Sequence, residues 1–271
     1  MAVTGTLMDD ATVNGVKLHF RLEGPPGAPV VALVNSLGTD LTLWDPQIGA
    51  LTQRYRVLRH DTRGHGRSAA PPGPYTMEML ADDVLALLSH VGAGRFHVVG
   101  ISLGGAQALA VGLRKPPGLA GIAICDSRLD VPPEGAKAID ERVRLVHDQG
   151  MKPLAEAMIQ RWFTPATLAA KPAYLDAVRS MLLATSIEGF AGCAAALKHS
   201  DLDARVDGLR VPALFVAGDQ DVALPVALMQ QTQARVLGAR SAIIPGAGHL
   251  SNIEQPAAFN AALLAFLDQV A

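Results

Sequence analysis

Residues 97–105 have the sequence HVVGISLGG, in which one serine lies between glycines at the end of an apolar run. Gly100, Ser102 and Gly104 match the pattern G-x-S-x-G, and an alanine-rich segment that favours a helix follows them. In this pattern the chain turns so sharply from a strand into a helix that side chains at both glycine positions would collide. The turn presents the serine hydroxyl at a helix N-terminus, where free N–H groups favour negative charge. Ser102 is therefore a candidate nucleophile.

Outward from this turn, apolar runs alternate with amphipathic segments along the chain. Asn14-Gly15 lies between two alternating runs and is typical of a two-residue hairpin turn. Thr76 is a candidate N-cap for the helical segment that follows it, and Gly92 is the candidate residue that ends this helix. Continuous apolar strands separated by helices predict an α/β fold with a mostly parallel central sheet, flanked by helices on both faces. After the hairpin, strands are expected within the segments 29–36, 56–61, 96–102, 119–127, 211–221 and 241–249, each of which also includes the residues that directly follow the strand.

This alternation is interrupted between residues 128 and 205, where short helical segments broken by Pro and Gly replace the strands. These segments are 137–150, 154–163, 172–186 and 190–200. Open parallel sheets bind ligands at the carboxyl ends of their strands. A helical insert between two strands of such a sheet is best explained as a cap over that edge, with helical decoration as the alternative. The predicted organisation is the first part of an α/β core in 1–127, a helical cap in 128–205 and the second part of the core in 206–271.

Composition limits the possible partners of the chain. It has 271 residues, of which 23 are basic and 25 acidic, and no Lys/Arg stripe could follow a phosphate backbone, so we expect no nucleic-acid partner. The N-terminal sequence lacks a leader pattern, and no apolar stretch approaches the roughly 18 residues of a spanning helix. Cys125 and Cys193 lack metal-ligand spacing and are expected as buried free thiols. We expect a cytoplasmic protein without a membrane partner or structural metal, and composition leaves its oligomeric state open.

A serine is a weak nucleophile unless a base takes its proton and an acid orients that base. For a serine in this type of turn, the order along the chain is Ser, acid, His. His249 directly follows the last expected strand, whereas the other histidines fall in strands, in helices or in an earlier loop. We favour Asp221 as the acid, because Asp219 follows Gly218 so closely that it is expected to organise the turn. Asp126, after the strand that precedes the insert, is the alternative.

The negative oxygen formed during attack needs two backbone N–H donors, together called an oxyanion hole. One donor is expected at Leu103, directly after the serine, and the other in the loop that follows the strand at 29–36. Leu37 lies in that loop, where its N–H could point at the developing charge. Loss of one such donor typically costs roughly 3 kcal/mol of transition-state stabilisation.

The serine turn, the contexts of Asp221 and His249 and the helical insert resemble the α/β-hydrolase superfamily across nearly the whole chain. Several segments further resemble the 3-oxoadipate enol-lactonases of bacterial aromatic catabolism. Most hydrolases of this class have His-Gly where this chain has Asn35-Ser36. Phe190 and Ala194 depart from the family pattern, where Tyr and a second Cys are expected. The segments that carry the resemblance are 35–47 (NSLGTDLTLWDPQ), 60–68, 160–165 (QRWFTP), 190–197, 218–225 and 246–256.

The resemblance implies a serine hydrolase that opens the ring of an anionic enol-lactone to 3-oxoadipate through an acyl-enzyme, without metal or cofactor. A carboxylate in an apolar site needs a partner, and similar enol-lactonases carry the same Arg161-Trp162 pair. Arg161 would bind the carboxylate and Trp162 would form an apolar wall. The alternative interpretation, that Arg161 is solvated and Trp162 only packs within the cap, has equal weight. The alternative functions are a general carboxylesterase, a carbon–carbon bond hydrolase of aromatic ring-cleavage products and a non-catalytic ligand sensor.

Overall fold

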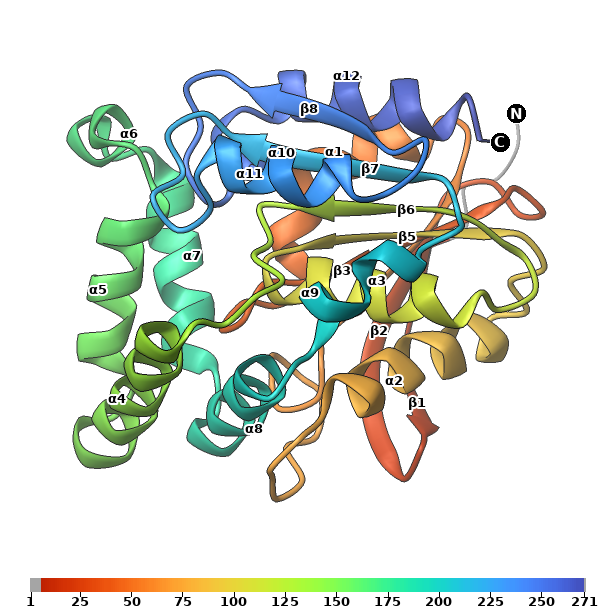
Figure 1. Cartoon of the computed structure of the whole chain (residues 1–271). Coiled ribbons are helices and arrows are strands. Elements are labelled where there is room, and N and C mark those ends of the chain that lie inside the picture. The colour runs from red at the N-terminus through yellow and green to blue at the C-terminus, as the bar shows by residue number, and fades with distance from the viewer. Residues whose placement is uncertain (1–5, 271) are drawn as a thin grey trace.

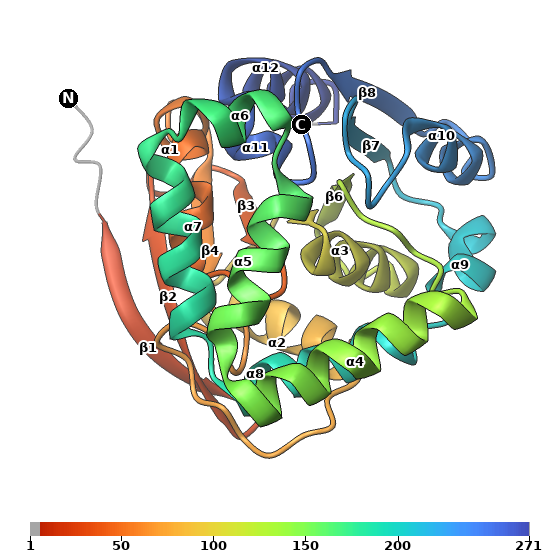
Figure 2. The same ribbon diagram turned by 90° about the vertical axis from the view of Figure 1, so that its left-hand side faces the viewer.

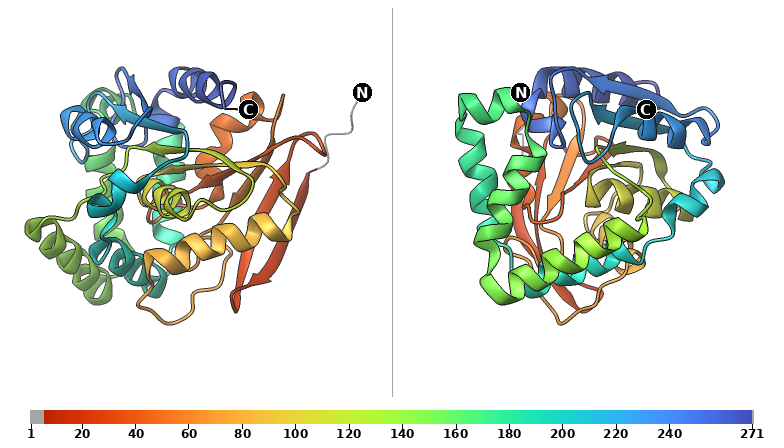
Figure 3. Two further views of the ribbon diagram at one scale, coloured as in Figure 1. Left: turned by 45° about the vertical axis from the view of Figure 1, so that its right-hand side comes forward. Right: turned by 60° about the vertical axis from the view of Figure 1, so that its left-hand side comes forward.

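The computed structural model describes residues 6–270 and contains one eight-stranded sheet, in the order β1-β2-β4-β3-β5-β6-β7-β8. All neighbouring strands from β4 (Arg56–His60) to β8 (Arg240–Ile244) are parallel. Strands β1 (Leu7–Val13) and β2 (Val16–Glu23) extend the sheet in antiparallel pairs. Figure 3 shows this hairpin at the opposite edge of the sheet from β8. The α/β fold with a mostly parallel sheet, expected from the sequence, is confirmed.

The hairpin turns at Asn14 and Gly15, whose φ angles are 49° and 74°. A two-residue turn of this kind needs positive φ at both positions, and Asn and Gly adopt it at low cost. Asn14 Nδ2 also donates to Asp83 Oδ1, at 3.1 Å, on α2 (Met77–His90). That helix begins where the sequence predicts, because the Thr76 side chain accepts from Met79 N.

The central strands are buried along their whole length, which explains their continuous apolar sequences. Figure 1 shows α2 and α3 on one face of the sheet and α1 and α12 on the other. At the edge, β8 exposes Arg240 and Ser241. The remaining core elements are β3 (Val30–Val34), the 3₁₀ turn η1 (Leu41–Trp44), α1 (Asp45–Leu51), β5 (Phe96–Ile101), α3 (Leu103–Arg114), β6 (Leu119–Cys125), η2 (Val206–Gly208), β7 (Ala213–Gly218), α10 (Val226–Ala234), α11 (Ser251–Glu254) and α12 (Pro256–Leu267).

Between β6 and β7 the chain is helical. Figure 1 shows α4 to α8 beyond the carboxyl ends of the strands, and Figure 2 shows them from that side. Helix α4 packs against α5 and α8, and α5 packs against α7. The short helices α6 and α9 were not expected from the sequence. The bounds in this segment are α4 (Pro133–Gln149), α5 (Met151–Trp162), α6 (Pro165–Ala170), α7 (Ala173–Ala184), α8 (Ile187–Lys198) and α9 (Leu202–Arg205).

Two findings bear on the expected surroundings of the chain. Within residues 6–270, no single helix is long and apolar enough to cross a membrane. Helices α7 and α8 have the length and composition of a membrane span only when taken as a pair, and they are bent by 95° relative to each other. Cys125 and Cys193 are buried free thiols, as the sequence predicts. The expectation of no leader, and the ends of the predicted core, involve residues 1–5 and 271, which lie outside the described residues.

Candidate active site

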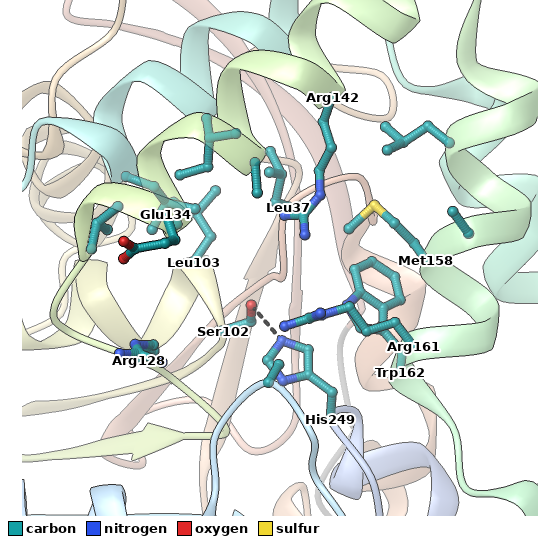
Figure 4. Close-up of a pocket in the computed structure, with 18 of the residues that line it drawn as sticks. Leu37, Ser102, Leu103, Arg128, Glu134, Arg142, Met158, Arg161, Trp162 and His249 are labelled. Carbon is teal, nitrogen blue, oxygen red and sulfur yellow. Dashed lines mark hydrogen bonds between the residues drawn. The ribbon is translucent and has the colours of Figure 1, made fainter.

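Ser102 lies between β5 and α3 with φ 55° and ψ −116°, a conformation that residues with side chains rarely adopt. The neighbouring glycines make this turn possible. A Cβ at Gly100 would lie 1.9 Å from Gly104 O, and a Cβ at Gly104 would lie 2.1 Å from Val34 O. Ser102 N donates to Cys125 O at 2.8 Å, which ties the turn to the end of β6. The result is a serine hydroxyl that faces a cavity (Figure 4).

His249 joins Ser102 and Asp221 into one hydrogen-bonded line. His249 Nε2 lies 2.9 Å from Ser102 Oγ, and its Nδ1 lies 2.8 Å from Asp221 Oδ2. Asp221 Oδ1 accepts from Ala223 N at 2.7 Å, so the carboxylate is itself held in place. When Nδ1–H donates to the carboxylate, Nε2 is left with a lone pair for the serine proton. This geometry is suited to activating the Ser102 hydroxyl.

The electrostatics of the line agree with that chemistry. Burial disfavours a charged His249, but the charge and hydrogen bond of Asp221 outweigh burial and raise the pKa of His249 above 6.5. Burial would likewise raise the pKa of Asp221, yet its contact with His249 holds that pKa below 3.8. An ionised Asp221 can therefore stabilise the imidazolium that forms when His249 takes a proton.

The structure separates the two acids that the sequence left open. Asp126 Oδ1 accepts from Gly218 N at 2.9 Å, and Oδ2 accepts from Ser251 Oγ at 2.5 Å, so its contacts lie beside the hydrogen-bonded line of Ser102, His249 and Asp221. Asp219 Oδ1 accepts from Gly246 N at 2.7 Å and links two loops. Of these acids, Asp221 is the one bonded to His249.

Leu37 and Leu103, the expected oxyanion donors, both line the cavity beside Ser102. The loop of Leu37 is held at two points: Asn35 Nδ2 donates to His60 O at 2.7 Å, and Gly38 N donates to His65 Nε2 at 2.9 Å. Burial lowers the pKa of His65 to about 4, so its ring stays neutral and keeps the acceptor lone pair. His65 therefore supports the loop that carries Leu37.

The insert also contacts the His249 loop. His249 N donates to Trp162 O at 2.7 Å, and the two rings stack with centroids 6.1 Å apart. Glu254 accepts from Gly248 N at 2.7 Å with one oxygen and from Thr164 Oγ1 at 2.6 Å with the other. Trp162 is buried and lines the cavity, so it combines packing with a place in the wall of the site.

A cavity of about 530 Å³ lies between Ser102 and the insert helices. Its wall is largely apolar, with Ile139, Leu154 and Met158 among the lining side chains. Arg142 from α4 and Arg161 from α5 interrupt this wall, and Figure 4 shows both guanidinium groups directed into the space above Ser102.

Arg142 and Arg161 have no anionic partner in the part of the chain that the structure describes. Among residues 6–270, no carboxylate lies within ion-pair distance of Arg142 or Arg161, whereas Arg128, also on the cavity wall, pairs with Asp130 at 2.8 Å. Burial lowers the pKa of Arg142, and the charge of Arg161 lowers it further. Arg142 is half-buried, whereas Arg161 is exposed at the cavity. An anion between the two cations would relieve their mutual repulsion.

Arg142 is a site residue that the sequence reasoning missed. A local signal was present, because Arg142 follows Ile139 by three residues and precedes Val146 by four. These spacings place the three side chains on one face of α4, and a charge within an apolar face is unusual. The direction in which that face points depends on the path of the whole insert, which the sequence alone does not reveal.

These features agree with the comparisons to known proteins. The chain belongs to the Alpha/beta hydrolase family, whose model matches residues 26–262. It is 33% identical over 259 residues to 3-oxoadipate enol-lactonase 2 of Acinetobacter baylyi, with 96% of each chain covered. The enol-lactonase of Burkholderia xenovorans is 38% identical with a TM-score of 0.92, over 96% of this chain and 100% of that one. A thermophilic esterase of Thermogutta terrifontis is 30% identical with a TM-score of 0.91, over 97% and 99%. The resemblance inferred from the sequence is confirmed.

Proposed function

We propose that this protein is a serine hydrolase that opens small lactones bearing a carboxylate, with 3-oxoadipate enol-lactone as the substrate. The observation that carries the proposal is that the Ser102–His249–Asp221 line opens into a cavity with two arginines that have no anionic partner among residues 6–270. The similarity to enol-lactonases over 96% of the chain supports the same substrate class. Residues 128–205 act in this proposal as the cap, and two buried free thiols are consistent with a reducing cytoplasm.

In the proposed complex, the lactone carbonyl lies at Ser102 and the pendant carboxylate lies between Arg142 and Arg161. A guanidinium can donate two parallel hydrogen bonds to a carboxylate, which fixes the orientation of the ring. Trp162 and the apolar cap side chains cover the rest of the ring and exclude water.

The proposed reaction proceeds through an acyl-enzyme in two stages. Ser102 Oγ attacks the ring carbonyl carbon while His249 Nε2 takes the hydroxyl proton, and the N–H groups of Leu37 and Leu103 stabilise the oxyanion. Collapse of this intermediate breaks the ring C–O bond, and the enolate oxygen that leaves takes the proton back from His249. The enol becomes a ketone. Water, deprotonated by His249, then attacks the acyl carbon, and Ser102 leaves with the proton, which releases 3-oxoadipate.

The role of the arginines is tested by substrate charge. We expect Arg142→Ala and Arg161→Ala each to lower kcat/KM for the enol-lactone by about 10- to 100-fold, the effect of losing a hydrogen bond to a charged group. Hydrolysis of a neutral aryl acetate should change by less than about threefold, because it has no carboxylate to lose. Arg128→Ala is the matched control, since Arg128 is already paired with Asp130.

Four outcomes would contradict this proposal. Equal losses on the charged and neutral substrates would mean that the arginines serve only the stability of the cap. A wild-type protein that hydrolyses the aryl acetate but leaves the lactone intact would be a general carboxylesterase, the function that the similarity to the Thermogutta esterase favours as second candidate. Turnover of a vinylogous diketone alone would assign carbon–carbon bond hydrolysis, and failure with all three substrates would favour a ligand sensor.

A further inference from the structure

Asp126, which directly follows β6, contacts two loops of the proposed catalytic site. Its side chain is fully buried. Oδ1 accepts from Gly218 N at 2.9 Å, and Gly218 precedes Asp221 by three residues. Oδ2 accepts from Ser251 N at 3.2 Å and from Ser251 Oγ at 2.5 Å, and Ser251 follows His249 by two residues. One carboxyl group therefore joins the loop of the acid to the loop of the base.

The backbone next to Asp126 also contacts Ser102, the third residue of the hydrogen-bonded line. Asp126 N donates to Val216 O at 2.9 Å, and the carbonyl of Cys125 accepts from Ser102 N at 2.8 Å. Asp126 has a φ of 45°, which is unfavourable for a residue with a side chain and persists only where the surroundings enforce it. The loops that carry the nucleophile, the acid and the base thus meet at residues 125 and 126.

A buried carboxyl group at this junction is energetically demanding. Burial and the nearby charge of Asp221 raise the pKa of Asp126 to about 7, while the hydrogen bonds from Ser251 and Gly218 oppose that rise. The charged groups that face Asp126 are Asp221 and His249. If the carboxyl were removed, Gly218 N and Ser251 N would each lose their acceptor in a buried environment, and the two loops would be free to shift.

We propose that Asp126 is a positioning residue, which holds Ser251 and Gly218 so that the His249 ring stays at bonding distance from both Ser102 and Asp221. This inference rests on the proposed serine-hydrolase mechanism. The chain then contains two buried acids with separate tasks. Asp221 bonds the imidazole and selects its tautomer, and Asp126 bonds the backbone that carries the imidazole.

The test measures hydrolysis of a neutral aryl acetate, which does not depend on Arg142 or Arg161. We expect Asp126→Ala to lower kcat by on the order of 100-fold, the scale of a misplacement of about 1 Å, with little change in KM. Ser251→Ala, which removes one hydroxyl and keeps the carboxylate, should lower kcat by about tenfold, again with little change in KM. Circular dichroism and urea unfolding establish that each variant is folded. If Asp126→Ala does not fold, the milder Ser251→Ala decides the question.

The pH profile separates positioning from a merely structural role. The charge of Asp126 helps to raise the pKa of His249, and His249 must be neutral to take the serine proton. With its own pKa at about 7, Asp126 is charged only in the upper part of the acid limb. Asp126→Asn should therefore move that part of the kcat/KM profile to lower pH, because the imidazole there loses its proton at lower pH. Ser251→Ala keeps the carboxyl group but removes a hydrogen bond that lowers the pKa of Asp126, so it should produce a smaller shift in the same direction.

The inference would be overturned by unchanged kcat in folded Asp126→Ala and Ser251→Ala, or by a loss confined to KM. An Asp126→Asn loss as large as that of Asp221→Asn would also overturn it, because Asp126 would then share the task of Asp221. Ester hydrolysis that survives in Ser102→Ala would instead refute the underlying mechanism, so the two failures are distinguishable.

Discussion

Ser102 is the proposed nucleophile and has an unfavourable backbone conformation. Its effect on activity and its effect on stability can be measured separately. At φ 55° and ψ −116°, a residue with a Cβ is strained at a cost of about 1–3 kcal/mol. Ser102→Ala keeps the Cβ, so we expect kcat to fall by on the order of 10⁶-fold while the free energy of unfolding stays near that of the wild type. Ser102→Gly should be equally inactive and about 1 kcal/mol more stable than Ser102→Ala, because relief of strain exceeds the entropic cost of glycine.

Urea unfolding and single-turnover assays on the same preparations check both expectations. Turnover retained in Ser102→Ala would remove Ser102 as nucleophile. A glycine variant no more stable than the alanine variant would show that the turn stores no strain. Either result is informative about one property without deciding the other.

At the residue scale, the sequence predicted Ser102, Asp221 and His249 as candidates because each follows a recognisable strand, and chain order narrows the choice. The acids at 126 and 221 could not be separated in this way, because both follow strands that end at the same edge of the sheet. The distance of 2.8 Å between Asp221 and His249 depends on how two loops pack. Arg142 was missed for a related reason, since its relevance depends on where α4 lies over the sheet.

At the scale of elements, the contact between α3 and β3 couples the serine turn to the loop of Leu37. A Cβ at Gly104 would lie 2.1 Å from Val34 O, a backbone atom that cannot rotate away. We expect Gly104→Ala to lower the free energy of unfolding by about 1–3 kcal/mol, the range for overpacked cores. It should also lower kcat more than it changes KM, because the displaced strand carries the oxyanion loop.

Gly49 on α1 provides the matched control for this substitution. A Cβ at Gly49 would meet nothing within 4 Å, so Gly49→Ala should stabilise the protein by up to about 1 kcal/mol through helix propensity. Urea unfolding of both variants measures the difference in sign. If Gly104→Ala matched the wild type in stability and kcat, close packing of α3 on β3 would not position the site.

Some turns and helix ends can be predicted from local sequence patterns alone. The hairpin at Asn14-Gly15 and the start of α2 at Thr76 follow from local chemistry, and both are present. Helix α4 begins at Pro133, four residues before the helical pattern recognised in the sequence, and the short helices α6 and α9 were not anticipated. The helices α6 and α9 have six and four residues, too few to show a helical period along the sequence.

At the scale of the whole molecule, three buried histidines make stability depend on pH. Burial lowers the pKa of His60, His65 and His97 to about 4 in each case. The unfolded chain binds a proton at each of these residues near pH 6.5, whereas the folded protein does so only near pH 4. Between these values the unfolded state holds more protons, so the free energy of unfolding falls as the pH falls, by about 1.4 kcal/mol per pH unit for each histidine. Asp126, with its raised pKa, offsets part of this dependence.

His97 allows this dependence to be measured for a single group. It is fully buried in β5, its ring lies edge-on to Tyr55, and within residues 6–270 neither ring nitrogen has a hydrogen-bond partner. His97→Leu should make the decline in unfolding free energy below pH 6.5 shallower by about 1.4 kcal/mol per pH unit, because one fewer proton is bound on unfolding. Urea unfolding at a series of pH values measures the slope, with the exposed His147→Gln as a control that leaves it unchanged. If His97→Leu kept the wild-type slope, protonation of His97 on unfolding would not contribute to acid destabilisation.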